Sequence, residues 1–203
     1  MLAAGACVAA APEPEQPELV GDATRALRNM ISAQVLEPRS SNGACECTAA
    51  FLSGVSSRPQ LQAAVFQAIL PELPALALHP LLLEPLFHLL QQVVSSMIEE
   101  ATLPTAELSE LTITAFNTQP CAKGLDFVKI LLFAMRDLAA GQVVLRSSVA
   151  STARVVAADP AGHADLTEGL FALLATLTKK LPQHVAAVRE SLPELVELGN
   201  YYE

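Results

Sequence analysis

The chain has 203 residues, of which 52% are hydrophobic and 16% are charged, and so much apolar surface excludes a wholly disordered protein. Aromatic residues make up only 4% and Trp is absent, while Leu and Ala are abundant, so the composition favours helices over strands. A formal net charge of −9 disfavours attraction to phosphate backbones or anionic lipid, and we expect no direct nucleic-acid partner.

The first 18 residues are expected to form a disordered leader. Residues 11–18 read APEPEQPE, and proline and glutamate at this density favour an extended, solvated chain. The opening MLAAGACVAAAP lacks the basic segment that begins a secretory signal. No apolar run reaches the roughly 18 residues that a membrane span requires, so we expect no membrane insertion.

From residue 19 onward, apolar residues recur at helical spacing between short breaks, which predicts a series of helices. Asp22 suits the N-cap of the first helix, Pro59 suits the first position of the third, and Gly141 suits the end of the sixth. Three prolines between Pro71 and Pro80 predict a connection there. The predicted helices cover residues 22–36, 44–55, 60–70, 81–99, 106–116, 123–139, 142–157, 163–180 and 182–198.

These helices group into pairs that begin about 37 to 45 residues apart, followed by one unpaired helix. That period is typical of HEAT and armadillo arrays, in which stacked pairs share a continuous core. We therefore expect an all-α fold, an α-solenoid of antiparallel helix pairs, with about four pairs and a terminal helix over residues 19–203. A globular helical bundle is the alternative, because helix lengths alone do not exclude it.

No constellation of residues indicates catalysis. Cys45 and Cys47 come nearest to a metal or redox motif, but two positions apart on a helix their side chains point about 200° apart. Together with Cys7 and Cys121 they are spaced irregularly, which favours reduced thiols in a cytosolic or nuclear protein.

The histidines also lack the spacing of a metal site, since no two stand three to five residues apart on one helix. They are His79, His88, His163 and His184. Phosphate-cradling glycine loops are absent, and the stripe Phe127, Ile130, Leu131, Ala134 and Leu138 is typical of a helix core. We expect no catalytic residue, no metal ligand and no cofactor, and a protein that is not an enzyme.

Two segments carry a family resemblance. Residues 162–174 read GHADLTEGLFALL and are followed by KKLP at 179–182, and residues 78–90 read LHPLLLEPLFHLL. They resemble late repeats of the importin-β (karyopherin-β) superfamily of nuclear transport receptors, of the transportin-SR type, in which a His-x-Asp element starts a helix with a Leu-Phe-x-Leu core. The resemblance runs from Ala75 to Val188 and indicates a C-terminal HEAT-repeat segment.

The resemblance implies a superhelical receptor that carries protein cargo through nuclear pores under control of the GTPase Ran, and that resides in both nucleus and cytoplasm. It carries over no catalytic residue, and no segment here corresponds to the N-terminal repeats that chiefly bind Ran. An acidic chain suits basic or Arg-Ser-rich cargo, which residues 44–55, 81–99, 123–139 and 163–180 would face as inner helices. Individual protein-binding residues are not assigned.

A helical-repeat scaffold subunit of a larger complex is the alternative. High apolar content with few charges fits a protein whose faces are covered by neighbouring subunits, because exposed apolar patches mark interfaces.

Overall fold

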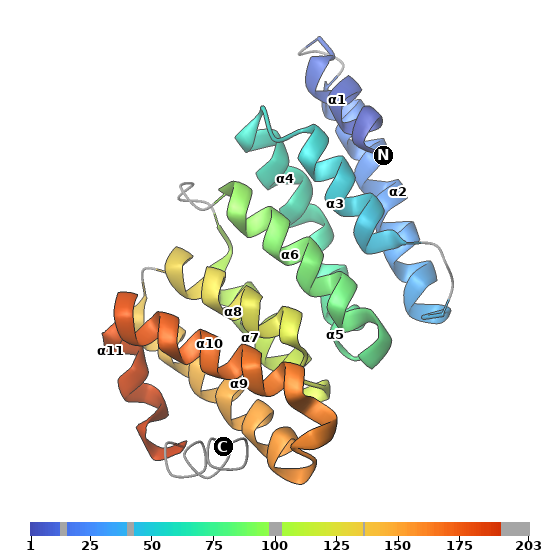
Figure 1. Ribbon diagram of the computed structural model, residues 1–203. Helices are drawn as coiled ribbons and strands as arrows, with labels where there is room; N and C mark the ends of the chain where they lie inside the picture. The colour runs from blue at the N-terminus through green and yellow to red at the C-terminus, as the bar shows by residue number, and fades with distance from the viewer. Residues whose placement is uncertain (13–15, 40–42, 98–102, 136, 192–203) are drawn as a thin grey trace. The chain divides into compact units, whose positions relative to one another are not determined.

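A computed structural model describes residues 1–12, 16–39, 43–97, 103–135 and 137–191 (Figure 1). These residues form helices and connections with no strand among them, which confirms the all-α class. The chain divides into two compact units, an N-terminal unit of residues 1–104 and a C-terminal unit of residues 105–203. Each unit buries apolar side chains of its own.

The N-terminal unit consists of helices in two layers. The elements are α1 (Leu2–Ala10), α2 (Gln16–Leu36), α3 (Ala44–Gly54), α4 (Pro59–Ile69), η1 (Leu70–Glu72), α5 (Leu73–Ala77), η2 (Pro80–Leu82) and α6 (Leu83–Met97). In one layer α2 contacts α4 and α5, and in the other α3 lies between α1 and α6 (Figure 1). Phe51, Phe66 and Phe87 are fully buried in this unit, and each such side chain contributes roughly 1.5–3 kcal/mol.

Part of the expected disordered leader, residues 1–18, is helical, because Leu2–Ala10 form α1 and pack on α3, while residues 13–15 lie outside the described residues. The contact depends on two glycines. A Cβ atom on Gly5 would lie 3.0 Å from the Cα of Gly54, and a Cβ on Gly54 would lie 2.9 Å from the Cα of Gly5. The two backbones can approach this closely only because neither residue has a side chain.

The start of α2 also differs from the prediction. The helix begins at Gln16, so Asp22 lies inside it and pairs with Arg25 at 3.0 Å instead of acting as an N-cap. The short helix α5 lies within the connection predicted between Pro71 and Pro80. The prolines there occupy the first turns of η1, α5 and η2. Proline is tolerated in a first turn because its missing N–H would have no partner there. The expected Pro59 start of α4 is confirmed.

The C-terminal unit also consists of helices, packed against each other in pairs. Its elements are α7 (Thr105–Thr118), α8 (Ala122–Ala134), α9 (Leu138–Ala158), η3 (Ala161–His163), α10 (Ala164–Lys180), α11 (Pro182–Val185) and η4 (Ala186–Ser191). The helix α7 packs along α9, and α8 packs along α10. Phe116 and Phe127 are among the fully buried side chains.

The helix predicted over 123–139 is wrong at its end, because α8 stops at Ala134 and Met135 is extended, with φ −77° and ψ 129°. Asp137 then caps α9, accepting hydrogen bonds from the N–H groups of Ala139 at 2.9 Å and Ala140 at 3.2 Å. Gly141, expected to end the preceding helix, therefore lies inside α9. A capping aspartate satisfies otherwise unpaired donors, and this fixes a new helix start.

The predicted terminal helix over 182–198 begins at Pro182 as expected, but it becomes the 3₁₀ helix η4 after Val185. The Arg146 Nε donates to the carbonyl of Ala187 at 3.2 Å, and Val188 is fully buried. The rest of the predicted helix, residues 192–198, lies outside the described residues.

Candidate functional site

The candidate site comprises the helices that the sequence assigns to an inner, cargo-facing layer. In the N-terminal unit these are α3 and α6, which contact each other. In the C-terminal unit they are α8 and α10, which also contact each other. Each unit therefore brings together the two helices expected to share a surface.

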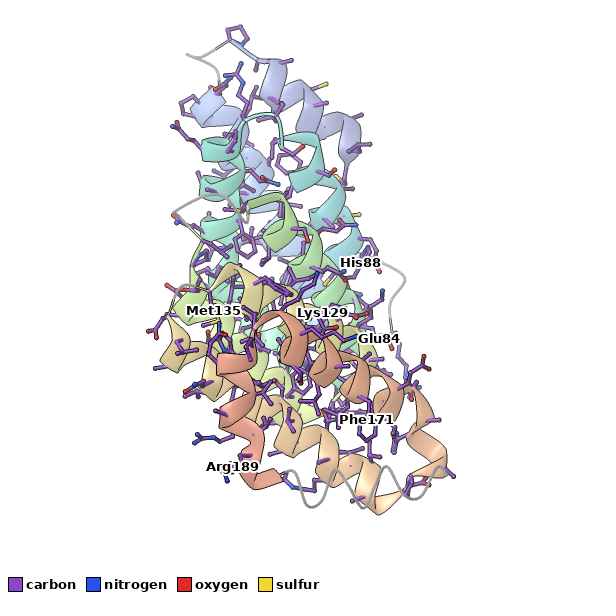
Figure 2. The ribbon with its side chains drawn as sticks, turned by 60° about the vertical axis from the view of Figure 1, so that its left-hand side comes forward. Glu84, His88, Lys129, Met135, Phe171 and Arg189 are labelled. Carbon is purple, nitrogen blue, oxygen red and sulfur yellow. The ribbon has the colours of Figure 1, made fainter. Side chains whose placement is uncertain are left out.

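The exposed side of α6 carries a line of polar side chains. Glu84, His88 and Gln92 are four residues apart, so they lie one above another on the helix surface, and all three are exposed. The Nε2 atoms of Gln92 and His88 are 3.0 Å apart. Figure 2 shows Glu84 and His88 projecting from this helix.

Beside this line lies a hollow of about 400 Å³ between the ends of α3 and α6, which we call the α3–α6 hollow. Its lining is mostly polar or small: Ala49, Leu52, Ser53, Ser56, Gln62, Gln92, Val93, Ser95 and Ser96. Many hydroxyl and carboxamide groups around one concave surface can bind the backbone and polar side chains of a peptide.

Gln62 of α4 is buried beside this hollow and forms hydrogen bonds to both of the helices that line it. Only 2% of the residue is exposed, and its Nε2 donates to the Leu52 carbonyl at 3.2 Å and to the Ser96 hydroxyl at 2.9 Å. The Ser96 hydroxyl in turn donates to the Val93 carbonyl at 2.8 Å. One carboxamide therefore links α4 to both α3 and α6, and it fixes the positions of the two helices that line the hollow.

The corresponding surface of the C-terminal unit is more apolar. Phe133 of α8 is 41% exposed and Phe171 of α10 is 38% exposed, and Figure 2 shows Phe171 on α10. The Lys180 Nζ lies 5.9 Å from the centre of the Phe133 ring, a cation–π distance. Lys129 pairs with Asp126 at 3.0 Å on α8. Aromatic and cationic groups together are typical of protein-binding surfaces.

The cysteines and histidines do not converge. Cys45 and Cys47 lie on α3, with the first buried and the second half-buried. Burial raises the pKa of the Cys45 thiol to about 12, and the adjacent Glu46 carboxylate adds to the rise. Within the part of the chain that the structure describes, no three His, Cys, Asp or Glu side chains are grouped to hold a metal ion.

His184 is the histidine with the most unusual surroundings. It is buried in α11 against Gly141 of α9, and its Nδ1 has no hydrogen-bond partner among the described residues. Burial lowers the pKa of His184 below its ordinary value of 6.5. The ring therefore packs against α9 within the core of the C-terminal unit.

The sequence interpretation missed Gln62 and the α3–α6 hollow. A signal was present, because Gln62, Val65, Phe66 and Ile69 share the i, i+3, i+4, i+7 spacing of one helix face. A glutamine on an otherwise apolar face indicates a buried hydrogen-bonding role.

No helix among the described residues is both long and apolar enough to cross a membrane. The chain matches no protein-family model, no curated protein and no solved structure.

Proposed function

We propose that this chain is a protein-binding helical-repeat module, a HEAT-like α-solenoid segment of a nuclear transport receptor of the importin-β superfamily. The observation that carries the proposal is the layering within each unit, where α3 contacts α6 and α8 contacts α10. In a stacked array, the second helices of successive pairs line one surface. The family itself is proposed on the two resembling segments, residues 78–90 and 162–182.

The cargo surface in the N-terminal unit is the exposed side of α3 and α6 with the α3–α6 hollow. Glu84 gives it a carboxylate, His88 and Gln92 continue the line, and the serines of the hollow supply neutral hydrogen bonds. A basic, serine-rich peptide complements such a surface, because arginine pairs with carboxylate and serine with amide groups.

Binding of a fluorescein-labelled Arg-Ser repeat peptide, measured by anisotropy, tests this surface. We expect Glu84→Gln to weaken binding several-fold, because it removes the charge at the head of the polar line. Glu37→Gln is the matched control, since Glu37 is exposed just beyond the end of α2 and outside the hollow. Equal weakening by both variants would show that only net charge matters.

A scaffold subunit of a larger complex is a second candidate. It is favoured by large apolar side chains that stand in solvent, of which Leu36 is 82% exposed and Leu78 is 62% exposed. Partners that co-purify in fixed ratio and stay bound when Ran–GTP is added would favour the scaffold. Release of a basic cargo by Ran–GTP, from a chain that includes the N-terminal repeats of the family, would favour the receptor.

A further inference from the structure

The carboxamide of Gln62 beside the α3–α6 hollow can point in only one direction. A backbone carbonyl only accepts hydrogen bonds, so the atom 3.2 Å from the Leu52 carbonyl oxygen must be the donor Nε2. The Ser96 hydroxyl has one proton and gives it to the Val93 carbonyl at 2.8 Å, so it can only accept from Gln62, at 2.9 Å. Both Nε2 protons are therefore used, and turning the carboxamide over would lose both hydrogen bonds.

The oxygen of this carboxamide is left for the hollow. Gln62 lines the hollow although only 2% of the residue is exposed. Its Oε1 accepts no hydrogen bond from the described residues and is not sealed off from solvent. Because Leu52 and Ser96 occupy the Nε2 side, the hollow is the side from which Oε1 can be reached. A buried acceptor of fixed direction therefore meets whatever enters the hollow.

A neighbouring serine adds a second acceptor. The Ser56 hydroxyl donates its proton to the Ser53 carbonyl at 2.7 Å, so its oxygen has only lone pairs to offer to the hollow. None of the described residues that line the hollow is charged. A group that enters must therefore bring hydrogen-bond donors, and an acceptor on it would meet the lone pairs of Gln62 and Ser56.

The arginine side chain fits these requirements best. Asn, Gln and peptide groups bring an acceptor with their donors, whereas a guanidinium group has five N–H donors and no acceptor. A lysine ammonium group also only donates, but it is more strongly hydrated and loses more when a neutral hollow replaces its water.

The charge of the surrounding unit also favours a cation. Residues 1–104 contain four arginines and no lysine, against ten Asp or Glu residues, at positions 13, 15, 18, 22, 37, 46, 72, 84, 99 and 100.

We propose that the α3–α6 hollow is a subsite for one arginine of a bound peptide, whose guanidinium group donates to the Gln62 Oε1 and the Ser56 Oγ. The inference deepens the proposed function and rests on it for the identity of the peptide, because it places an arginine of the basic cargo in this hollow. Gln62 determines the specificity, since Leu52 and Ser96 hold its oxygen toward the ligand.

Titration of the ¹⁵N-labelled full chain with methylguanidinium chloride tests the hollow without any peptide. We expect a saturable shift of the Gln62 side-chain amide signals, and a shift about tenfold smaller with methylammonium chloride at the same concentration. Ser95→Leu should abolish the shift, because Ser95 is exposed and lines the hollow, and leucine would fill it. Ser32→Leu is the matched control, since it places leucine at an exposed serine of α2 outside the hollow and should leave the shift unchanged.

Fluorescein-labelled Arg–Ser and Lys–Ser octapeptides, which have equal charge, extend the test to cargo. We expect the Lys–Ser peptide to bind about tenfold more weakly, and Ser95→Leu to remove this preference. Glu84→Gln should weaken both peptides alike, because a carboxylate attracts either cation.

The two arms separate the subsite from the proposed function. If neither peptide binds while methylguanidinium still shifts the Gln62 signals selectively, the proposed cargo is wrong and the arginine subsite stands. Equal shifts with the two small cations, equal binding of the two peptides, or equal behaviour of Ser95→Leu and Ser32→Leu would overturn the subsite.

Discussion

Two glycines that lie inside helices have opposite surroundings. Around Gly21 in α2, no atom other than those of the adjoining helix backbone lies within 4 Å of the position that a Cβ would occupy. At Gly141 in α9 a Cβ would lie 2.6 Å from Cε1 of His184 and 3.2 Å from Cδ2 of Leu132. Glycine in a helix interior lowers stability unless a neighbouring group fills the space that a side chain would occupy. Of these two glycines, only Gly141 has such a neighbour.

We therefore expect Gly21→Ala to raise the free energy of unfolding by about 0.5–1 kcal/mol, because alanine has the higher helix propensity. Gly141→Ala should lower it by about 1–3 kcal/mol, because the added methyl group overpacks the site. Urea unfolding followed by circular dichroism measures both. The same sign for the two variants would contradict the packing of His184 against α9.

The buried ring of His184 also makes stability depend on pH. Its pKa is lowered in the folded state, so below about pH 6.5 the unfolded chain binds the proton more readily than the folded chain. The stabilisation is present above the ordinary pKa and is lost as the pH falls towards the folded pKa. We expect His184→Phe to flatten the decrease in stability between pH 7.5 and pH 5.

Urea unfolding at several pH values measures this difference, and His88→Phe, at an exposed position on α6, serves as the control. Parallel pH profiles for the unchanged chain and His184→Phe would show that the ring does not titrate differently on folding.

At the scale of elements, α1 depends on one close backbone contact. A Cβ atom on residue 54 would clash with the carbonyl oxygen of Leu2 and would lie 2.9 Å from the amide nitrogen of Ala6. Backbone atoms of a packed helix cannot yield as a flexible side chain can.

Gly54→Ala should therefore displace α1 from α3 while the rest of the N-terminal unit stays folded. Hydrogen exchange measures this, since the amides of residues 2–10 should lose protection and those of α6 should keep it. Ser53→Ala, at the neighbouring exposed position of α3, should leave α1 protected. If the α1 amides stay protected in Gly54→Ala, the glycine contact does not hold the helix.

Other elements show how far the sequence predicts this fold. The sequence predicts four helices, over 44–55, 60–70, 106–116 and 163–180, to within a few residues of their bounds, because their apolar spacing and their breaks are local signals. The break after Ala134 was missed because the apolar stripe from Phe127 continues to Leu138, which is exposed in the next helix. Only the cap formed by Asp137 distinguishes the two helices.

The helix α1 and the α3–α6 hollow required information that no local pattern contains. Gly5 and Gly54 are 49 positions apart in the sequence, so the local spacing near either residue does not predict their contact. The α3–α6 hollow likewise depends on which faces of two separate helices meet. Fold class follows from periodicity, whereas sites follow from pairings between distant segments.

At the scale of the whole molecule, the chain is two units of about a hundred residues each. Phe51 and Phe66 are buried in the first, and Phe116 and Phe127 are buried in the second. This size is typical of a domain that folds independently.

We expect residues 1–104 and residues 105–203, produced separately, each to give a helical circular dichroism spectrum and a cooperative urea transition. The reason is that each unit has buried apolar side chains of its own, which can form the core of the separate fragment. A fragment that is unfolded alone but gains helix when the other fragment is added would show that the two cores depend on each other.

The buried thiol of Cys45 allows the opening of the N-terminal unit to be timed by thiol modification. Only a thiolate reacts quickly with alkylating reagents, and the Cys45 thiol is shielded and holds its proton to a pKa of about 12. Cys7, exposed on α1, is modified without any opening and so calibrates the reagent within the same molecule. The lag between the two modifications records how often α3 leaves the core.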